Sequence, residues 1–129
     1  MKIFEIGEKY YFEDLGIRNA IRPFRATDIG QVLENVVCHH LLVCGYALYI
    51  GRDGDKEVDF VLREGTRILR LVQVCYDISS PKTEKREVDS IVECAGELKC
   101  DNLVIVTYNY KCTIEKDGYK IDVVPITEF

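Results

Sequence analysis

Two neighbouring apolar runs, separated by a short polar break, constrain the fold of this chain most strongly. The runs span residues 57–62 and 68–75, and both have the length and the Val, Leu and Ile content of β-strands. Glu64 and Gly65 lie between them and have the chemistry of a tight turn. We therefore predict an antiparallel hairpin that lies inside a sheet and not at its edge.

Two polar residues interrupt this apolar hairpin. Asp59 lies within the first strand and Gln73 near the end of the second. Because side chains alternate between the faces of a strand, Gln73 and Cys75 share one face, and Val72 and Val74 point to the other. A buried carboxylate needs a partner, a proton or a metal ion, since its desolvation alone is costly. The alternative is that Asp59 ends a strand and hydrogen-bonds a turn.

The first predicted helix spans residues 27–44. Thr27 or Asp28 is suited to cap its N-terminus, and Gly45 follows its C-terminus. Residues at helical spacing define the stripe that we expect to be buried: Ile29, Val32, Leu33, Val36, Val37, His40 and Cys44. Glu34 falls at the margin of this stripe, where its carboxylate can reach a sheet packed against the helix. The alternative is an exposed glutamate that favours the helix by propensity.

A second helix is predicted for residues 81–99. Ser80 precedes it as a cap, and Pro81 occupies the first helical position. Its expected core face consists of Val88, Ile91, Val92, Ala95 and Leu98. The uninterrupted apolar run at residues 103–108 then predicts a strand that is buried on both sides of the sheet.

The remaining elements complete an α/β domain. We predict a short strand at residues 46–50, a loop at 51–55 and a final hairpin that turns at 117–118. The order of the elements indicates a mixed central sheet with helices on its faces. A chain of 129 residues is long enough for one such domain. We assign residues 1–26 to a peripheral N-terminal segment and residues 27–129 to the α/β domain.

Composition excludes some classes of function. The formal net charge of -5 argues against a dedicated nonspecific nucleic-acid binder, which is usually basic. Residues 63–86 nevertheless contain more basic than acidic side chains, which predicts a local patch that attracts phosphates. The alternative is an ordinary solvated surface with mixed charge. No apolar run is long enough to span a bilayer and no signal peptide is visible, so we expect a cytoplasmic protein.

The six cysteines are scattered through apolar segments, which favours reduced, buried thiols. Cys38, His39, His40 and Cys44 invite a zinc interpretation. However, a separation of six residues places Cys38 and Cys44 on different faces of a helix, and no Cys-x-x-Cys pair occurs in the sequence. The spacing therefore disfavours a structural zinc site.

The predicted elements follow the order helix, strand, Asp-bearing strand, a strand with two further site positions, helix and strand. This order resembles the PD-(D/E)xK nuclease-like fold, also called restriction-endonuclease-like. In that fold a helical Glu, a strand Asp, and a carboxylate and a Lys two residues apart on the next strand converge. The chemistry is metal-dependent phosphodiester hydrolysis. Oxygen ligands hold Mg²⁺, which polarises the phosphate and activates water, while the Lys positions the nucleophile or offsets charge.

Four ordered motifs resemble, more specifically, the C-terminal domain of a large family of prokaryotic AAA-type ATPases, a domain of unknown function in most members. The motifs lie at residues 9–12 with 14–19, 33–37, 57–61 and 73–77. The resemblance implies an N-terminal P-loop domain in the parent protein. This chain has no GxxxxGK[ST] motif and is therefore not expected to bind ATP in that way. We expect it to be the C-terminal domain separated from its ATPase, with Met1 as an added start.

The resemblance assigns roles to individual positions. Glu34 matches the helical Glu, Asp59 the metal-binding Asp, Gln73 the second carboxylate and Cys75 the Lys. The last two depart from the motif, because Gln73 brings no charge and a cysteine is not a cation at neutral pH. The implied Mg²⁺ ligands are Glu34, Asp59, Gln73 and the carbonyl of Val74, which make a weaker site than three carboxylates would.

The missing cation could come from Lys82, Lys85 or Arg86 at the start of the second helix. With Arg70, these residues are also our candidates for contacts with nucleic acid. Either the chain is a nuclease with a relocated cation, or the nuclease scaffold serves another purpose.

Three functions follow from these alternatives. The first is a Mg²⁺-dependent DNA endonuclease with Glu34, Asp59 and Gln73 as metal ligands. The second is a catalytically degenerate module that binds nucleic acid or a protein partner for its parent ATPase. The third is a dimerisation or docking domain that uses a tyrosine-rich surface. We expect the second, with DNA, the P-loop domain or a second copy of the chain as partner and without a membrane association.

Overall fold

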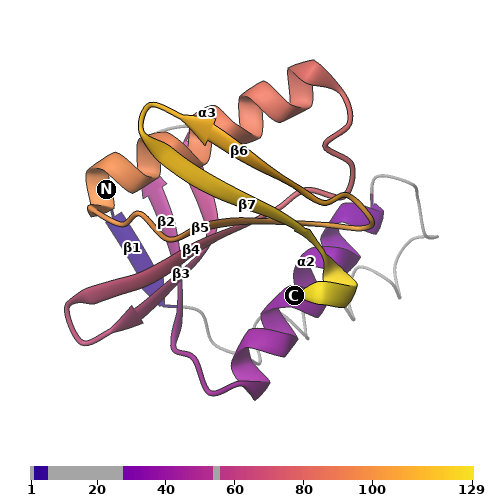
Figure 1. The fold of residues 1–129 in the computed structure, drawn as a ribbon. Coiled ribbons are helices and arrows are strands. Elements are labelled where there is room, and N and C mark those ends of the chain that lie inside the picture. Colours follow the sequence, from indigo (N-terminus) through magenta and orange to yellow (C-terminus); the bar gives the residue numbers. More distant parts are fainter. Residues whose placement is uncertain (1, 6–27, 54–55) are drawn as a thin grey trace.

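The computed structural model describes residues 2–5, 28–53 and 56–129. In chain order the elements are β1 (Lys2–Glu5), α2 (Asp28–Val43), β2 (Leu48–Asp53), β3 (Lys56–Glu64), β4 (Arg67–Val74), α3 (Pro81–Leu98), β5 (Leu103–Thr107), β6 (Cys112–Lys116), β7 (Tyr119–Pro125) and the 3₁₀ turn η1 (Ile126–Glu128). The strands form one seven-stranded sheet in the order β1-β2-β3-β4-β5-β7-β6 (Figure 1). β5 is parallel to both neighbours, and the other pairs are antiparallel. The predicted mixed α/β architecture is therefore confirmed.

The predicted central hairpin is confirmed as β3 and β4, which have neighbours on both sides. The antiparallel pairing runs from Glu64 and Arg67 at the turn to Phe60 and Val72. Gly65 has a φ of +62° at the turn, a conformation that a glycine adopts without steric cost. The two interrupting polar residues lie just beyond the end of this pairing, which positions them for the site described below.

The helices cover opposite faces of the sheet. On β5, all five residues of which are buried, Leu103 and Ile105 join a hydrophobic cluster with α3. Val104 and Val106 join a second cluster with α2. Because adjacent strand residues point to opposite faces, the two clusters form two layers of core. This confirms that β5 is buried on both sides.

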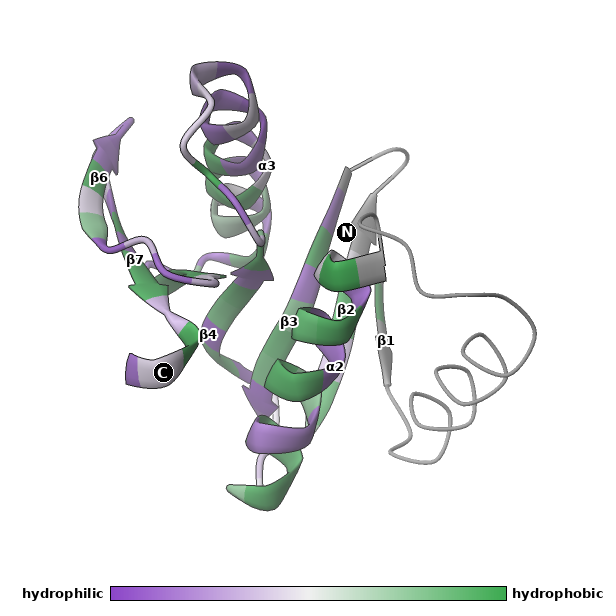
Figure 2. Cartoon of the chain, turned by 90° about the vertical axis from the view of Figure 1, so that its right-hand side faces the viewer, coloured by the Kyte–Doolittle hydropathy of each residue, from purple (hydrophilic) through white to green (hydrophobic). Residues whose placement is uncertain are grey.

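The second predicted helix is confirmed as α3. Pro81 lies in its first turn after Ser80, and the helix ends before Lys99, which has a φ of 55°. The residues expected on its core face are buried, except Leu98, which is half-buried. α3 is hydrophilic on much of its surface, whereas α2 is largely hydrophobic (Figure 2). α3 thus has one clear buried side, which its sequence pattern identified.

The predicted buried stripe of the first helix is wrong in part. α2 directs Leu33, Val37 and Leu41 into the core, while Val36 is 47% exposed and His40 and Cys44 are exposed. Apolar residues occupy almost every position after Asn35, so their spacing leaves the rotation of the helix about its axis undetermined.

The prediction for the chain before β3 is wrong in part, and another part of it lies outside the described residues. The expected loop at residues 51–55 is wrong for residues 51–53, which continue β2 as part of a hairpin with β3. β1, from the predicted peripheral segment, pairs with β2 at the edge of the sheet. The motifs at residues 9–12 and 14–19 lie outside the described residues.

The predicted C-terminal hairpin is confirmed as β6 and β7. Asp117 and Gly118 at its turn have φ angles of 52° and 84°. Within the part of the chain that the structure describes, neither helix has the length and apolar character needed to cross a membrane.

Candidate functional site

The candidate site lies where β3 and β4 separate. Their backbone pairing ends at Phe60 and Val72, and two side chains take over one residue further along. The backbone N–H of Asp59 donates to Oε1 of Gln73 at 2.9 Å. In return, the N–H of Val74 donates to Oδ2 of Asp59 at 2.8 Å. These two reciprocal hydrogen bonds replace the backbone hydrogen bonds that end at this point, and they fix both polar side chains to the sheet.

Gln73 also fastens the sheet to α3. Its Nε2 atom donates to Oε2 of Glu87 at 3.0 Å. Both ends of the amide are therefore used, which is the arrangement a polar side chain only 6% exposed requires. The Ser90 hydroxyl donates to the carbonyl of Glu57 at 3.2 Å, which joins α3 to β3 as well.

A cavity of about 490 Å³ opens at this point of the sheet. α2, β3, β4 and α3 all contribute to its lining, which consists of Gly30, Glu34, Glu57, Asp59, Gln73, Val74, Arg86, Glu87 and Ser90. The structure thus brings together Glu34, Asp59, Gln73 and Val74, the four residues that the resemblance assigned to Mg²⁺. Their role as ligands stays a prediction.

The cavity is acidic, with four carboxylates and one guanidinium group in its lining. The pKa of Asp59 is raised well above its ordinary value of 3.8, first by burial and then by the nearby carboxylate of Glu34. The Val74 N–H acts in the opposite direction because it stabilises the ionised form, while Glu87 and Glu57 raise the pKa further. A proton or another cation at Asp59 would relieve this repulsion.

Cys75 is not among the residues that line the cavity. Its thiol packs beside the α3 core cluster and lies 3.5 Å from the carbonyl oxygen of Asp77. Burial, followed by the charge of Glu87, raises the pKa of the Cys75 thiol to about 11. The side chain at the position of the motif's Lys is therefore a neutral thiol at neutral pH.

The basic residues of the sequence stretch 63–86 do not form one patch. Arg67 begins β4 and lines a different cavity with Lys99, whereas Arg86 lines the acidic cavity at the other end of that strand. At ~3.3 Å per strand residue these ends are about 20 Å apart.

The four candidates for nucleic-acid contact also differ from one another. Arg70 is half-buried on β4, and Lys82 is exposed. Lys85 pairs with Asp89 at 2.7 Å, and Arg86 lies 3.5 Å from Oε1 of Glu87.

The four residues that the resemblance assigned to Mg²⁺ offer oxygen donors. Carboxylate and amide oxygens are suitable donors. However, Oδ2 of Asp59 and Oε1 of Gln73 each accept a backbone N–H. Among the residues that the structure describes, no three His, Cys, Asp or Glu side chains are grouped so that they could hold a metal ion. The Mg²⁺ ligand set therefore stays a prediction, to which the structure adds four carboxylates around one cavity.

Sequence reasoning missed Glu57, Glu87 and Ser90. Glu57 precedes Asp59 by two residues, so strand alternation could have placed both on one face. Glu87 and Ser90 each lie next to a buried residue of α3, but only the tertiary arrangement shows that this side of the helix meets the end of β4.

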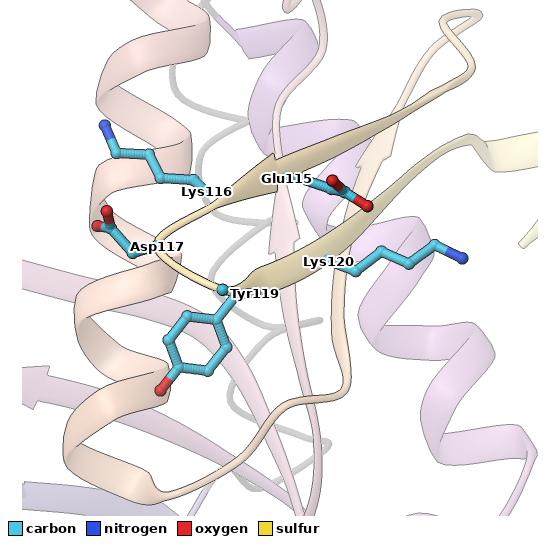
Figure 3. Close-up of a pocket in the computed structure, with 6 residues that line it drawn as sticks. Glu115, Lys116, Asp117, Tyr119 and Lys120 are labelled. Carbon is cyan, nitrogen blue, oxygen red and sulfur yellow. The ribbon is translucent and has the colours of Figure 1, made fainter.

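Another pocket, of about 310 Å³, lies at the β6–β7 turn. Figure 3 shows Glu115 and Lys120 extending from the same side of the hairpin, and they are direct partners in the register. Opposite charges on paired strand positions stabilise a hairpin, so these two residues are suited to a structural role. All six cysteines are free thiols, and Cys38 is buried whereas Cys44 is exposed beside His40.

An uncharacterized protein of Haemophilus influenzae is 29% identical over 113 residues, which are 88% of this chain and 26% of that protein. The chain thus spans about a quarter of the length of this relative. No solved structure matches the chain. The model of the family described as a domain of unknown function (DUF4143) matches residues 29–129, so the chain belongs to the DUF4143 family.

Proposed function

We propose that this domain is a catalytically degenerate, PD-(D/E)xK nuclease-like module that binds a protein partner as part of a longer AAA-type ATPase. The observation that carries the proposal is that both ends of the Gln73 amide are hydrogen-bonded within the protein. The amide accepts from the Asp59 N–H and donates to the Glu87 carboxylate. The residue at the position of the motif's second carboxylate therefore holds β3, β4 and α3 together. The neutral thiol of Cys75 supplies no cation beside it.

The charge distribution favours a protein partner over nucleic acid. The cavity is lined by four carboxylates, which repel phosphate groups. Two of the four basic candidates are paired with acidic residues of α3, Lys85 with Asp89 and Arg86 with Glu87. A nucleic-acid surface needs basic groups that are available to phosphates.

Exposed tyrosines after β4 and β5 support partner binding. Tyr76 and Tyr108 follow β4 and β5, and their rings stack at 5.0 Å with an interplanar angle of 15°. They are 36% and 52% exposed, and Tyr110 nearby in sequence is 43% exposed. Tyrosine is enriched at protein interfaces because it offers a large apolar area at a low entropic cost. The partner in this proposal is the P-loop domain of the parent protein. The matched region is about a quarter of the relative from Haemophilus influenzae, which leaves enough length for such a domain.

One observation favours a second candidate, a Mg²⁺-dependent endonuclease. Carboxylates from α2, β3 and α3 surround one cavity, and the guanidinium group of Arg86 lies at the same cavity. Such a collection would suit metal-assisted hydrolysis if the side chains moved closer together around an ion.

A plasmid-nicking assay separates the two candidates. We expect the wild-type chain to leave supercoiled plasmid intact in Mg²⁺ or Mn²⁺ and to show no retention of the plasmid at low salt, where phosphate contacts are strongest. Asp59→Asn is the control, because it removes the charge and keeps an acceptor for the Val74 N–H. Metal-dependent nicking by the wild type that Asp59→Asn abolishes would establish the endonuclease instead.

A further inference from the structure

Two adjacent charged residues of α3, Arg86 and Glu87, lie at the end of β4 where Gln73 is placed. Glu87 accepts the hydrogen bond from Nε2 of Gln73 at 3.0 Å, and its side chain is 15% exposed. The guanidinium group of Arg86 lies 3.5 Å from the other carboxylate oxygen of Glu87 and is 70% exposed. Both residues line the cavity. The cavity therefore has a half-buried carboxylate and an exposed cation in addition to Glu34 and Asp59.

Arg86 and Glu87 both line the cavity, whereas Cys75 does not. Arg86 is the basic residue among those that line the cavity, and its guanidinium group lies beside the carboxylate that accepts from Gln73. These contacts join Gln73, Glu87 and Arg86 at one cavity.

We infer that α3 supplies to the cavity the charge pair that positions 73 and 75 lack: Glu87 stands in for a carboxylate at position 73, and Arg86 stands in for a cation at position 75. Gln73 is then a positioning residue that fixes Glu87 against the end of β3 and β4. The statement that Glu87 and Arg86 replace a carboxylate at position 73 and a cation at position 75 rests on the nuclease-like proposal above. The hydrogen bond between Gln73 and Glu87 is independent of that proposal, since it holds for a catalytic and for a noncatalytic cavity.

The geometry explains why one amide and one carboxylate are needed. A carboxylate at position 73 would face Glu87 at hydrogen-bond distance without a proton between them. If position 87 carried an amide instead, that amide could donate to the new carboxylate, which would still accept the Asp59 N–H. The exchanged pair keeps the same number of hydrogen bonds and the same net charge, so it is the matched variant for this test.

The test is a double-mutant cycle of thermal unfolding at neutral pH in the presence of EDTA. We expect Gln73→Glu to lower Tm by about 10 °C, because it buries an uncompensated carboxylate. Glu87→Gln keeps an acceptor for Gln73 and should change Tm by less than about 3 °C. The Gln73→Glu/Glu87→Gln protein should return to within about 3 °C of the wild type.

Mg²⁺ provides the second readout. In the Gln73→Glu protein, the carboxylates of positions 73 and 87 and of Asp59 would together attract a cation. Added Mg²⁺ should therefore raise the Tm of this protein by about 5 °C or more. The rise in Tm should be smaller for the Gln73→Glu/Glu87→Gln protein. If Gln73→Glu does not fold, recovery of folding in the exchanged pair supports the inference. An exchanged pair no more stable than Gln73→Glu, or a Gln73→Glu protein that Mg²⁺ stabilises no more than the wild type, would overturn it. Nicking by the wild type would refute the proposed function and leave this cycle unaffected.

Discussion

Phe60→Ala is expected to lower the free energy of unfolding by about 3–5 kcal/mol. Phe60 is fully buried between the sheet and α2, in a cluster that includes Val37 and Leu41. Removal of its ring leaves a void between β3 and the helix that carries Glu34. Since Phe60 also follows Asp59 directly, we expect the loss of packing to loosen the cavity on its α2 side.

Urea unfolding of the wild type and the variant measures this effect. Tyr108→Ala is the control, because Tyr108 is 52% exposed and its ring stacks only on the surface. We expect this control to lose no more than about 1 kcal/mol. If Phe60→Ala lost no more than Tyr108→Ala, the α2 layer would not pack on the sheet as described.

Stability is expected to fall as pH rises above about 3.8, the ordinary pKa of an aspartate, and Asp59 is the cause. In the folded state burial and the charge of Glu34 raise the pKa of Asp59. Between the unfolded and the folded pKa the folded state therefore binds more protons, so the free energy of unfolding decreases with pH. Below the unfolded pKa both states are protonated, and this contribution to stability is fully present.

Asp59→Asn should flatten this slope. The variant cannot ionise, and its amide oxygen can still accept the Val74 N–H, so we expect it to exceed the wild type in stability at neutral pH. Denaturant unfolding at a series of pH values gives the comparison.

Asp89→Asn is the control of opposite sign. Hydrogen bonds from Lys116 and Lys85 lower the pKa of Asp89 to about 2, so its contribution is present at neutral pH and is lost as pH falls towards that value. If Asp59→Asn were less stable than the wild type at neutral pH, with the same pH slope, the account of the acidic cavity would be wrong.

The parts of the fold that the sequence predicted correctly have strong local signals. The β3–β4 and β6–β7 hairpins have continuous strand patterns on both sides of a turn with glycine. α3 has Ser80 and Pro81 at its start and a helical period in its apolar residues. In each case local propensity and burial favour the same structure, so a single sequence suffices.

The parts that were wrong or missed depend on tertiary structure. α2 has apolar residues on several sides, so its buried face is decided by the sheet and not by its own pattern. The basic residues of the stretch from 63 to 86 are close in sequence, but β4 separates Arg67 from Arg86. Glu87 was missed because the bond to Gln73 joins residues 14 apart in sequence and on different elements.

The central claim is that Glu34 and Asp59 face the same acidic cavity from α2 and β3. An NMR titration of carboxyl carbons in the wild type, in Glu34→Gln and in the control Glu115→Gln tests it most directly. We predict a pKa of Asp59 well above 3.8 in the wild type, a clear decrease in Glu34→Gln and no change in Glu115→Gln. An Asp59 that titrates at its ordinary pKa, with no response to Glu34→Gln, would contradict the claim.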